Sequence, residues 1–291
     1  MESIKMNDVQ IVEKILNSLD TDFQIEKKYL DNYTSKVYKI VNSNSENKIM
    51  KIFPDKYDYE REFEVIQALS DENLYEISFA GNWEGVYYII RNYIEGNILS
   101  SSYLENHLNV CFKLGQLLAK FHSVEAPDFF KESLGDIYMK WSTKSLQYFS
   151  IEKQNLIRKI ALNNTSTHSL TKITHMDFRL GNIIVDAKET VQVIDFESVK
   201  FTDPFLDFPK IRTELSKIGN NYWLEFAKGY DSLTDINILK QDNKHKIDFC
   251  EFLHGLGGLS FIHNSNRDTD DPFFIANRHI IESYLENYEN E

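Results

Sequence analysis

The sequence contains little cysteine and has a shortage of basic residues. Only Cys111 and Cys250 occur among 291 residues, far apart and without CxxC spacing. Disulfide-stabilised domains need paired cysteines, so we exclude a disulfide framework and expect a reducing compartment. The 32 basic residues are outnumbered by 45 acidic ones, which gives a net charge of −13. Because that charge repels phosphate backbones, we expect no nucleic-acid partner.

The sequence also lacks a hydrophobic run long enough to span a membrane. The most apolar window, residues 86–94, is too short and contains Arg91. The first residues mix both charge signs and lack the apolar run of a signal peptide. We therefore expect a cytoplasmic protein with no membrane partner. The hydrophobic share of 42% is sufficient for a sizeable core.

Hydrophobic periodicity divides the chain into a strand-rich first third and a mostly helical remainder. We predict an N-terminal lobe over residues 1–91, a hinge over 92–97 and a larger helical lobe over 98–291. The expected strands cover residues 37–41, 48–53, 85–94, 182–185 and 191–195. A short amphipathic helix is expected over residues 7–19, and the expected longer helices cover residues 59–69, 108–124, 139–162, 208–229, 245–262 and 274–288.

Polar residues interrupt the apolar sequence at THMDFRLGNIIVD, residues 174–186. Asn182 begins one short strand, and Asp195 ends the next, VQVID. A short hairpin can bring the two side chains together, and one carboxylate with one amide oxygen suits Mg²⁺. A buried carboxylate needs such compensation. For Asp195 alone, capping a turn or helix is an open alternative.

Asp177 adds a second element to this pattern. The spacing H-x-D-x-x-x-x-N, followed thirteen residues later by an aspartate, is typical of a protein-kinase-type catalytic loop and metal aspartate. In such a loop Asp177 orients an acceptor hydroxyl and receives its proton. Arg179 offsets charge on the transferred phosphoryl group. We expect His175 to brace the loop through hydrogen bonds.

A lysine in the strand KIMKIF also needs a partner. Lys51 has apolar neighbours on its own strand face, so an anion should lie close to it. Glu62 aligns with the inward apolar stripe of the helix over residues 59–69, and we therefore pair it with Lys51. Lys48, on the opposite face, is expected to be solvated. The alternative is that Lys51 is an ordinary surface lysine.

Taken together, these segments resemble the aminoglycoside phosphotransferase family, which is related to choline kinase. The resemblance covers residues 25–210 and is weak beyond them. It implies an α+β, two-lobed, protein-kinase-like fold with a small antiparallel sheet in the N-terminal lobe. It also implies ATP or GTP as donor, Mg²⁺, and phosphoryl transfer to a small-molecule hydroxyl. The matching segments are THMDFRLGNIIVD, VQVIDFESVKFTDPFLDF, IMKIFP, YEREFEVIQAL, YIIRNYIEG and GQLLAKFHSV.

The resemblance implies a role for each matched position. Asp177 becomes the catalytic base, and Asn182 and Asp195 become the metal ligands. Lys51 and Glu62 become the pair that positions the nucleotide phosphates.

The resemblance also concerns the nucleotide base and the phosphate-covering turn. Asn92 and Ile94 are implied to hold the base through backbone groups. The turn lacks the glycines of protein kinases, so we expect Thr34 and Ser35 to offer hydroxyl and N–H groups to phosphate. Arg91 stands where the family is usually apolar. It either points away from the base or alters the choice between adenine and guanine.

The acceptor is predicted from charge and resemblance. Residues 267–291 are rich in acid, which would attract a cationic, hydroxylated molecule such as an aminoglycoside, although a solvated tail is an equal alternative. A metabolic kinase for choline, an amino alcohol or a sugar stays open, with Trp223 or Tyr222 caging a quaternary ammonium. A nucleotide-binding regulator without catalysis is the third hypothesis. The residues to which we give only structural roles are Asp203, Asp207, His122, His254 and His263.

Overall fold

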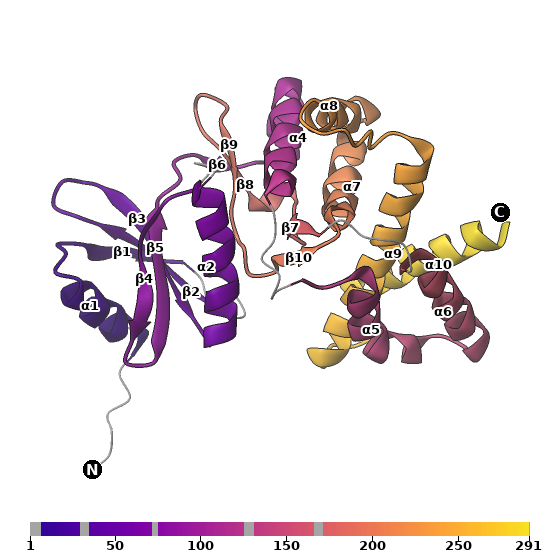
Figure 1. The fold of residues 1–291 in the computed structure, drawn as a ribbon, viewed down its shortest axis with the longest axis horizontal. Helices are drawn as coiled ribbons and strands as arrows, with labels where there is room; N and C mark the ends of the chain where they lie inside the picture. Colours follow the sequence, from indigo (N-terminus) through magenta and orange to yellow (C-terminus); the bar gives the residue numbers. More distant parts are fainter. Residues whose placement is uncertain (1–6, 30–34, 72–74, 125–130, 166–170, 291) are drawn as a thin grey trace, which may run out of the picture. The chain divides into compact units, whose positions relative to one another are not determined.

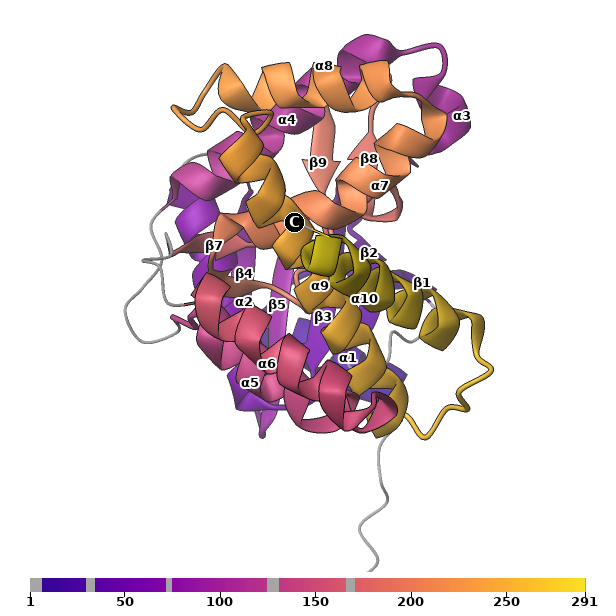
Figure 2. The same ribbon diagram turned by 90° about the vertical axis from the view of Figure 1, so that its right-hand side faces the viewer.

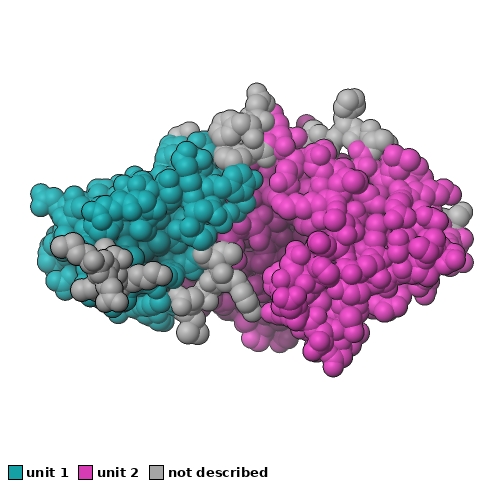
Figure 3. Space-filling view, turned by 90° about the horizontal axis from the view of Figure 1, so that it is seen from below, with its two compact units in different colours: residues 1–95 teal, residues 96–291 magenta. Residues whose placement is uncertain are grey.

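The computed structural model describes residues 7–29, 35–71, 75–124, 131–165 and 171–290 (Figure 1). The chain forms two compact units, residues 1–95 and residues 96–291, which are coloured separately in Figure 3. This division falls within residues 92–97, whose role as a hinge stays a prediction. Thr34 lies outside the described residues.

Unit 1 contains a five-stranded antiparallel sheet with the order β1-β2-β3-β5-β4. The predicted antiparallel sheet is thereby confirmed. Strand β1 was not predicted, because its sequence QIEKK is largely exposed and has no apolar alternation. The strands are β1 (Gln24–Lys28), β2 (Lys36–Val41), β3 (Asn47–Phe53), β4 (Ile77–Trp83) and β5 (Val86–Asn92).

Two helices cover the two faces of this sheet (Figure 1). Helix α1 (Asp8–Ser18) begins with a capping box between Asn7 and Gln10, and it buries its apolar stripe against β2, β3 and β5. Helix α2 (Lys56–Asp71) packs on the opposite face. Because side chains alternate along a strand, β3 buries Met50 under α1 and turns Lys51 toward α2.

Unit 2 is mostly helical, with short strands around the predicted catalytic loop (Figure 2). Helices α4 and α8 pack so closely that a Cβ on Gly115 would lie 2.1 Å from the Phe226 carbonyl oxygen. The helices are α3 (Ser101–Leu104), α4 (Leu108–Ser123), α5 (Leu134–Ser145), α6 (Ile151–Thr165), α7 (Phe208–Ile218), α8 (Asn220–Asp231), α9 (Gln241–Asn264) and α10 (Pro272–Asn290). The strands are β6 (Asn97–Ile98), β7 (Lys172–Thr174), β8 (Ile183–Val185), β9 (Val191–Val193) and β10 (Lys200–Thr202).

Two long helices predicted from periodicity are each broken in the structure. The segment 139–162 divides into α5, a 3₁₀ turn (Leu146–Tyr148) and α6, because Phe149 is extended and buries its ring. The segment 208–229 divides into α7 and α8 at Gly219, whose backbone is also extended. Among the described helices, none is both long and apolar enough to cross a membrane.

Candidate active site

Lys51 and Glu62 meet within unit 1. Lys51 Nζ lies 2.6 Å from Glu62 Oε2, and the two residues are only 9% and 4% exposed. Burial of both charges explains why each needs the other. The sequence predicted this pairing from the periods of β3 and α2. The role of the pair toward a nucleotide stays a prediction.

The expectation that Lys48 is solvated is wrong. Lys48 is buried, and its Nζ lies 2.7 Å from Glu46 and donates to Ser78 Oγ at 2.8 Å and Asn92 Oδ1 at 3.1 Å. The prediction failed because Ser78 belongs to β4, a strand that the sequence did not reveal. Lys48 instead ties the ends of three strands together.

The residues expected around the nucleotide base lie at the end of β5. The Asn92 N–H already donates to the Glu76 carbonyl at 3.3 Å, so it is engaged within the sheet. Ile94 follows the strand, and its backbone forms no hydrogen bond with another described residue. Ser35 is buried directly before β2. Of these residues, Ile94 retains the backbone groups that a base could use.

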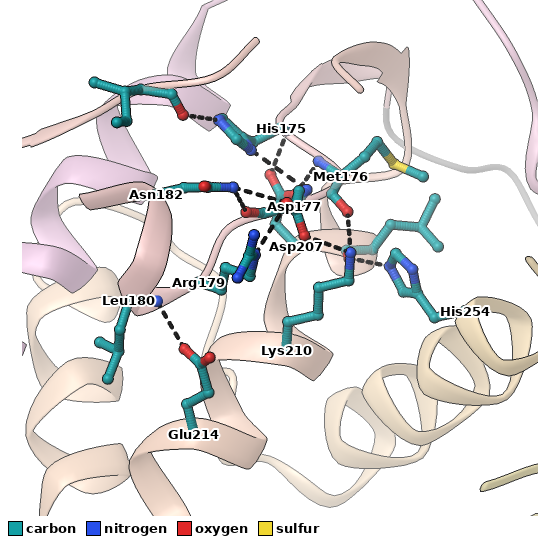
Figure 4. A network of polar contacts seen from close by, with 12 residues as sticks. His175, Met176, Asp177, Arg179, Leu180, Asn182, Asp207, Lys210, Glu214 and His254 are labelled. Atoms are coloured by element: carbon teal, nitrogen blue, oxygen red, sulfur yellow. Dashed lines mark hydrogen bonds and ion pairs between the residues drawn. The ribbon is translucent and has the colours of Figure 1, made fainter. Parts of the chain in front are cut away.

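Asp177 is the centre of a polar network in unit 2 (Figure 4). Its Oδ1 accepts from Lys210 Nζ at 2.6 Å. Its Oδ2 accepts from Asn182 Nδ2 at 2.7 Å and from Arg179 Nε at 3.1 Å. The structure therefore brings Asp177, Arg179 and Asn182 together, as their spacing predicted, and adds Lys210, which the sequence did not reveal.

The charges around Asp177 keep its carboxylate ionised. Burial is the largest single influence and raises the pKa of Asp177, but Lys210 and then Arg179 outweigh it, so the pKa is lowered from its ordinary value. His175 is fully buried, and this burial lowers its pKa. Its Nε2 lies 3.1 Å from the Ile194 carbonyl oxygen, and its Nδ1 lies 3.3 Å from the Asp177 N–H. These contacts define a neutral ring protonated on Nε2, which braces the loop as expected.

The loop contains a strained residue that Asp207 holds in place. Met176 has a φ of 66°, a left-handed conformation that is unfavourable for a bulky side chain. Asp207 Oδ1 accepts from the Met176 N–H at 2.6 Å, and its Oδ2 accepts from the His175 N–H at 2.7 Å. His122 Nε2 lies 3.1 Å from the same Oδ2. The structural role expected for Asp207 is therefore confirmed, because its carboxylate fixes the loop backbone.

The residues that sequence reasoning missed lie at the start of α7. Lys210 Nζ also donates to the Met176 carbonyl at 3.1 Å, and Glu214 Oε2 accepts from the Leu180 N–H at 2.7 Å. Asp207, Lys210 and Glu214 are separated by three and four positions, so they share one helix face. Polar residues at this spacing on one face of α7 were the signal that could have revealed them.

Asn182 and Asp195 lie on adjacent segments. Ile194 N–H donates to the Asn182 carbonyl at 2.8 Å, one residue before Asp195. The Asn182 amide nitrogen is committed to Asp177, which leaves its amide oxygen to face a cation. Asp195 has a left-handed φ of 69°, and its charge acts on Arg179. An amide oxygen and a carboxylate fit Mg²⁺.

The rest of a magnesium shell would have to come from elsewhere. Within the described ranges, no group of three or more His, Cys, Asp and Glu side chains is placed to hold a metal ion. Mg²⁺ commonly binds through one or two protein groups together with waters and substrate phosphates. The residue pair 182 and 195 suits that mode of binding.

A cavity of about 640 Å³ lies elsewhere in unit 2, between α9 and α10. Its lining includes Asp248 and Glu251, which Arg212 already pairs at 2.5 Å and 2.6 Å. None of the predicted site residues lines it.

This fold and loop define a kinase-type phosphotransferase. The model of the phosphotransferase enzyme family (APH) matches residues 27–232, most of the chain. The chain belongs to this family and is a small-molecule kinase. The predicted α+β kinase-like fold is confirmed. No curated protein matches the chain by sequence.

Several solved structures share this fold. Amicoumacin kinase hAmiN, in complex with AMP-PNP, Ca²⁺ and Ami, has a TM-score of 0.71 at 14% identity and covers 97% of this chain and 94% of its own. APH(2")-IIIa, in complex with GDP and kanamycin, has a TM-score of 0.69 at 10% identity, with coverages of 96% and 99%. Choline kinase LicA from Streptococcus pneumoniae has a TM-score of 0.68 at 16% identity, also with coverages of 96% and 99%. At these identities the likeness shows the fold alone.

Proposed function

We propose that the protein transfers the γ-phosphoryl group of ATP or GTP to a hydroxyl of a small molecule, with Asp177 as the base. The observation that carries this proposal is the state of the Asp177 carboxylate. Its Oδ2 accepts two hydrogen bonds, whereas its Oδ1 accepts one, from Lys210. Each carboxylate oxygen has two lone pairs, so Oδ1 has room for one more donor. An acceptor hydroxyl can occupy that place.

The proposed reaction is a direct displacement. The acceptor oxygen forms a bond to the γ-phosphorus, the bond from that phosphorus to the β–γ bridging oxygen breaks, and the nucleoside diphosphate leaves. The hydroxyl proton passes to Asp177 Oδ1. The lowered pKa of Asp177 keeps the carboxylate ionised and able to orient the hydroxyl. Arg179 supplies positive charge beside the transferred group.

We propose that Asn182 and Asp195 hold Mg²⁺ through side-chain oxygens. When bound, the ion neutralises charge on the nucleotide phosphates. Asp195→Ala should therefore remove the Mg²⁺-dependent part of nucleotide binding, measured by calorimetry with and without the metal. Asp177→Asn is the matched comparison and should retain it. Equal Mg²⁺ dependence in Asp195→Ala and the wild type would exclude Asp195 as a ligand.

We assign the nucleotide contacts of unit 1 to four residues, one of which is oriented by Glu62. Lys51, oriented by Glu62, reaches the α- and β-phosphates. Ser35 offers hydroxyl or N–H groups to phosphate, as Thr34 was expected to do. Ile94 holds the base through its backbone groups, which bond to no other described residue. The Asn92 N–H is engaged with Glu76, so only its carbonyl is assigned to the base.

An aminoglycoside or similar cationic antibiotic is the first acceptor class we propose. The proposal rests on the family membership and on the net charge of −13. Part of the acidic C-terminal stretch is neutralised locally, because Glu282 pairs with Arg278 at 3.1 Å and with Lys153 at 3.3 Å. The global charge therefore supports this acceptor more than any particular carboxylate does.

A metabolic acceptor such as choline, an amino alcohol or a sugar is the second candidate. The contacts of Trp223 and Tyr222 do not favour an aromatic cage formed by these two residues. The Trp223 ring stacks on Phe226 with centroids 5.3 Å apart, and the Tyr222 hydroxyl donates to the Glu105 carbonyl at 3.3 Å. Both side chains are thus occupied within unit 2.

A transfer assay tests the proposed function. The purified protein is incubated with γ-labelled ATP or GTP, Mg²⁺, and aminoglycosides, macrolides, choline, homoserine or sugars. Labelled product should form with the wild type and be nearly lost with Asp177→Asn. Failure with every cationic antibiotic would remove the first acceptor class. Nucleotide binding without transfer to any acceptor would favour a regulator.

A further inference from the structure

Arg91 lies on the same sheet face as Lys51. It pairs with Ile49 of β3, and Lys51 pairs with Ile89 of β5. Residues opposite one another, and residues two apart on one strand, share a face. The register therefore places Lys51 and Arg91 on one face and turns both away from α1. Whether Arg91 also faces the base stays a prediction.

The guanidinium of Arg91 has no partner there. It forms no hydrogen bond or ion pair with any residue for which the structure gives a position. Tyr75 and then Glu62 act on it electrostatically, but Glu62 Oε2 is already bonded to Lys51 at 2.6 Å. Burial lowers the pKa of Arg91, as expected for a desolvated cation. A partly buried charge in this state is unfavourable unless a ligand supplies acceptors.

The surroundings of Arg91 indicate the shape of that ligand. Lys51 lies toward one end of this face, and Ile94, whose backbone bonds to no other described residue, follows the other end of β5. Partly exposed Ile49 lies directly opposite Arg91 and supplies apolar surface beside it, whereas Ile89 is buried. A planar, apolar group with hydrogen-bond acceptors on one edge fits this arrangement, provided that phosphates lie over Lys51.

The guanidinium distinguishes between the two common purines. It carries only donors, in a planar fork. Guanine presents two adjacent acceptors, O6 and N7, and arginine binds this edge through two hydrogen bonds. Adenine presents an amino donor in place of O6, which would face the arginine donors. The residue thus favours guanine over adenine.

We propose that the phosphoryl donor is a guanine nucleotide and that Arg91 binds the O6 and N7 edge of its base, an inference that rests on the proposed function. Arg91 is then a specificity-determining residue of unit 1.

Nucleotide binding tests this proposal without knowledge of the acceptor. Calorimetry on the full-length protein with Mg²⁺ compares GTP, ATP and inosine triphosphate, which keeps O6 and N7 but lacks the 2-amino group. GTP and inosine triphosphate should bind roughly ten- to hundred-fold more tightly than ATP. Arg91→Met should weaken the binding of GTP and of inosine triphosphate to the level of ATP, and it should leave the affinity for ATP unchanged. Arg91→Lys keeps the charge but loses the planar fork, so its affinity for GTP should lie between those of the wild type and Arg91→Met.

Arg61→Met is the matched control, because Arg61 is a half-buried arginine of the same unit paired with Asp58 at 2.8 Å. It should keep the wild-type preference. ATP binding as tightly as GTP to the wild type overturns the proposal, as does an equal loss of both nucleotides in Arg91→Met. If Arg91→Met does not fold, the wild-type ranking and Arg91→Lys decide. Absence of all nucleotide binding is a different result, because it removes the proposed function itself.

Discussion

Each unit contains a carboxylate that is paired with a lysine, but the two are held in different ways. In unit 1, Glu62 is 4% exposed and bonds to Lys51 between a regular helix and a regular strand. In unit 2, the Asp177 side chain is 22% exposed and accepts from three side chains. It also follows Met176, a residue with a left-handed backbone.

This difference separates a brace from a reactive group. The buried pair of Lys51 and Glu62 joins β3 to α2. Neither charge can move without leaving the other unpaired, so the pair fixes the distance between these two elements. Asp177 keeps some exposure, and its three donors fix the direction of its oxygens while leaving space at Oδ1. Removing Glu62 should therefore affect stability most, whereas removing the Asp177 carboxylate should affect turnover most.

Asp177→Asn should produce the largest effect on turnover. The amide cannot take the acceptor proton, and it also places a donor toward Lys210 or Arg179. We expect turnover to fall by about a hundred- to ten-thousand-fold, with nucleotide affinity unchanged because Asn182 and Asp195 remain. Steady-state transfer assays together with calorimetry check this. Turnover near the wild-type rate would exclude Asp177 as the base.

Glu62→Leu should instead produce a large loss of stability. It leaves the Lys51 ammonium buried without its anion, which costs about 3–5 kcal/mol. The double variant Lys51→Met with Glu62→Leu should recover most of this loss, since no charge is then buried. Urea denaturation gives the values. Glu60→Leu, on the exposed side of the same helix, is the control and should stay near the wild type. Equal losses of unfolding free energy in the single and double variants would contradict a bracing role for the Lys51–Glu62 pair.

The same contrast explains what the sequence could predict. Lys51 and Glu62 were found because each lies in a periodic element whose inward face is readable. The grouping of Asp177, Asn182 and Asp195 was predictable because one loop and one hairpin fix their spacing. Lys210 and Glu214 were not found, because they bond to a loop carboxylate and to loop backbone whose position no periodicity gives.

The fold shows a similar limit. Helix α1 was predicted because its apolar stripe is regular, whereas β1 is an exposed edge strand with no pattern of its own. The break between α5 and α6 depends on where Phe149 finds a buried position, which is a tertiary effect. The burial of Lys48 is likewise a tertiary effect, because it depends on contacts with other strands, and it was not predicted.

The two units should also differ in their response to acid. All eight histidines follow residue 95, and burial, together with Lys210, lowers the pKa of His254 from 6.5 to about 4. Between these values the unfolded chain binds a proton that the folded chain does not, so stability falls as pH decreases from 6.5 to 4. At about 1.4 kcal/mol for each pKa unit, the loss is on the order of 3 kcal/mol.

His254→Gln should reduce this acid-dependent loss, because glutamine can still donate to the Leu206 carbonyl but does not titrate. Unfolding free energies measured from pH 7 to pH 4 provide the test. His279→Gln, at an exposed position, should keep the wild-type dependence. An unchanged slope in His254→Gln would show that the acid sensitivity arises elsewhere, for example at His175, whose pKa burial also lowers.

Lys210→Met should have the smallest effect on stability and thereby sharpen the contrast with Lys51. The Lys210 side chain is 39% exposed, so solvent screens its pairing with Asp177 and its removal should cost less than about 1 kcal/mol. Turnover should nevertheless fall by about tenfold, less than the hundred-fold that a misplacement of 1 Å can cause, because Arg179 and Asn182 still hold Oδ2. Lys210→Arg should restore most of the activity. A loss of stability as large as that of Glu62→Leu, with turnover intact, would make Lys210 a second structural brace.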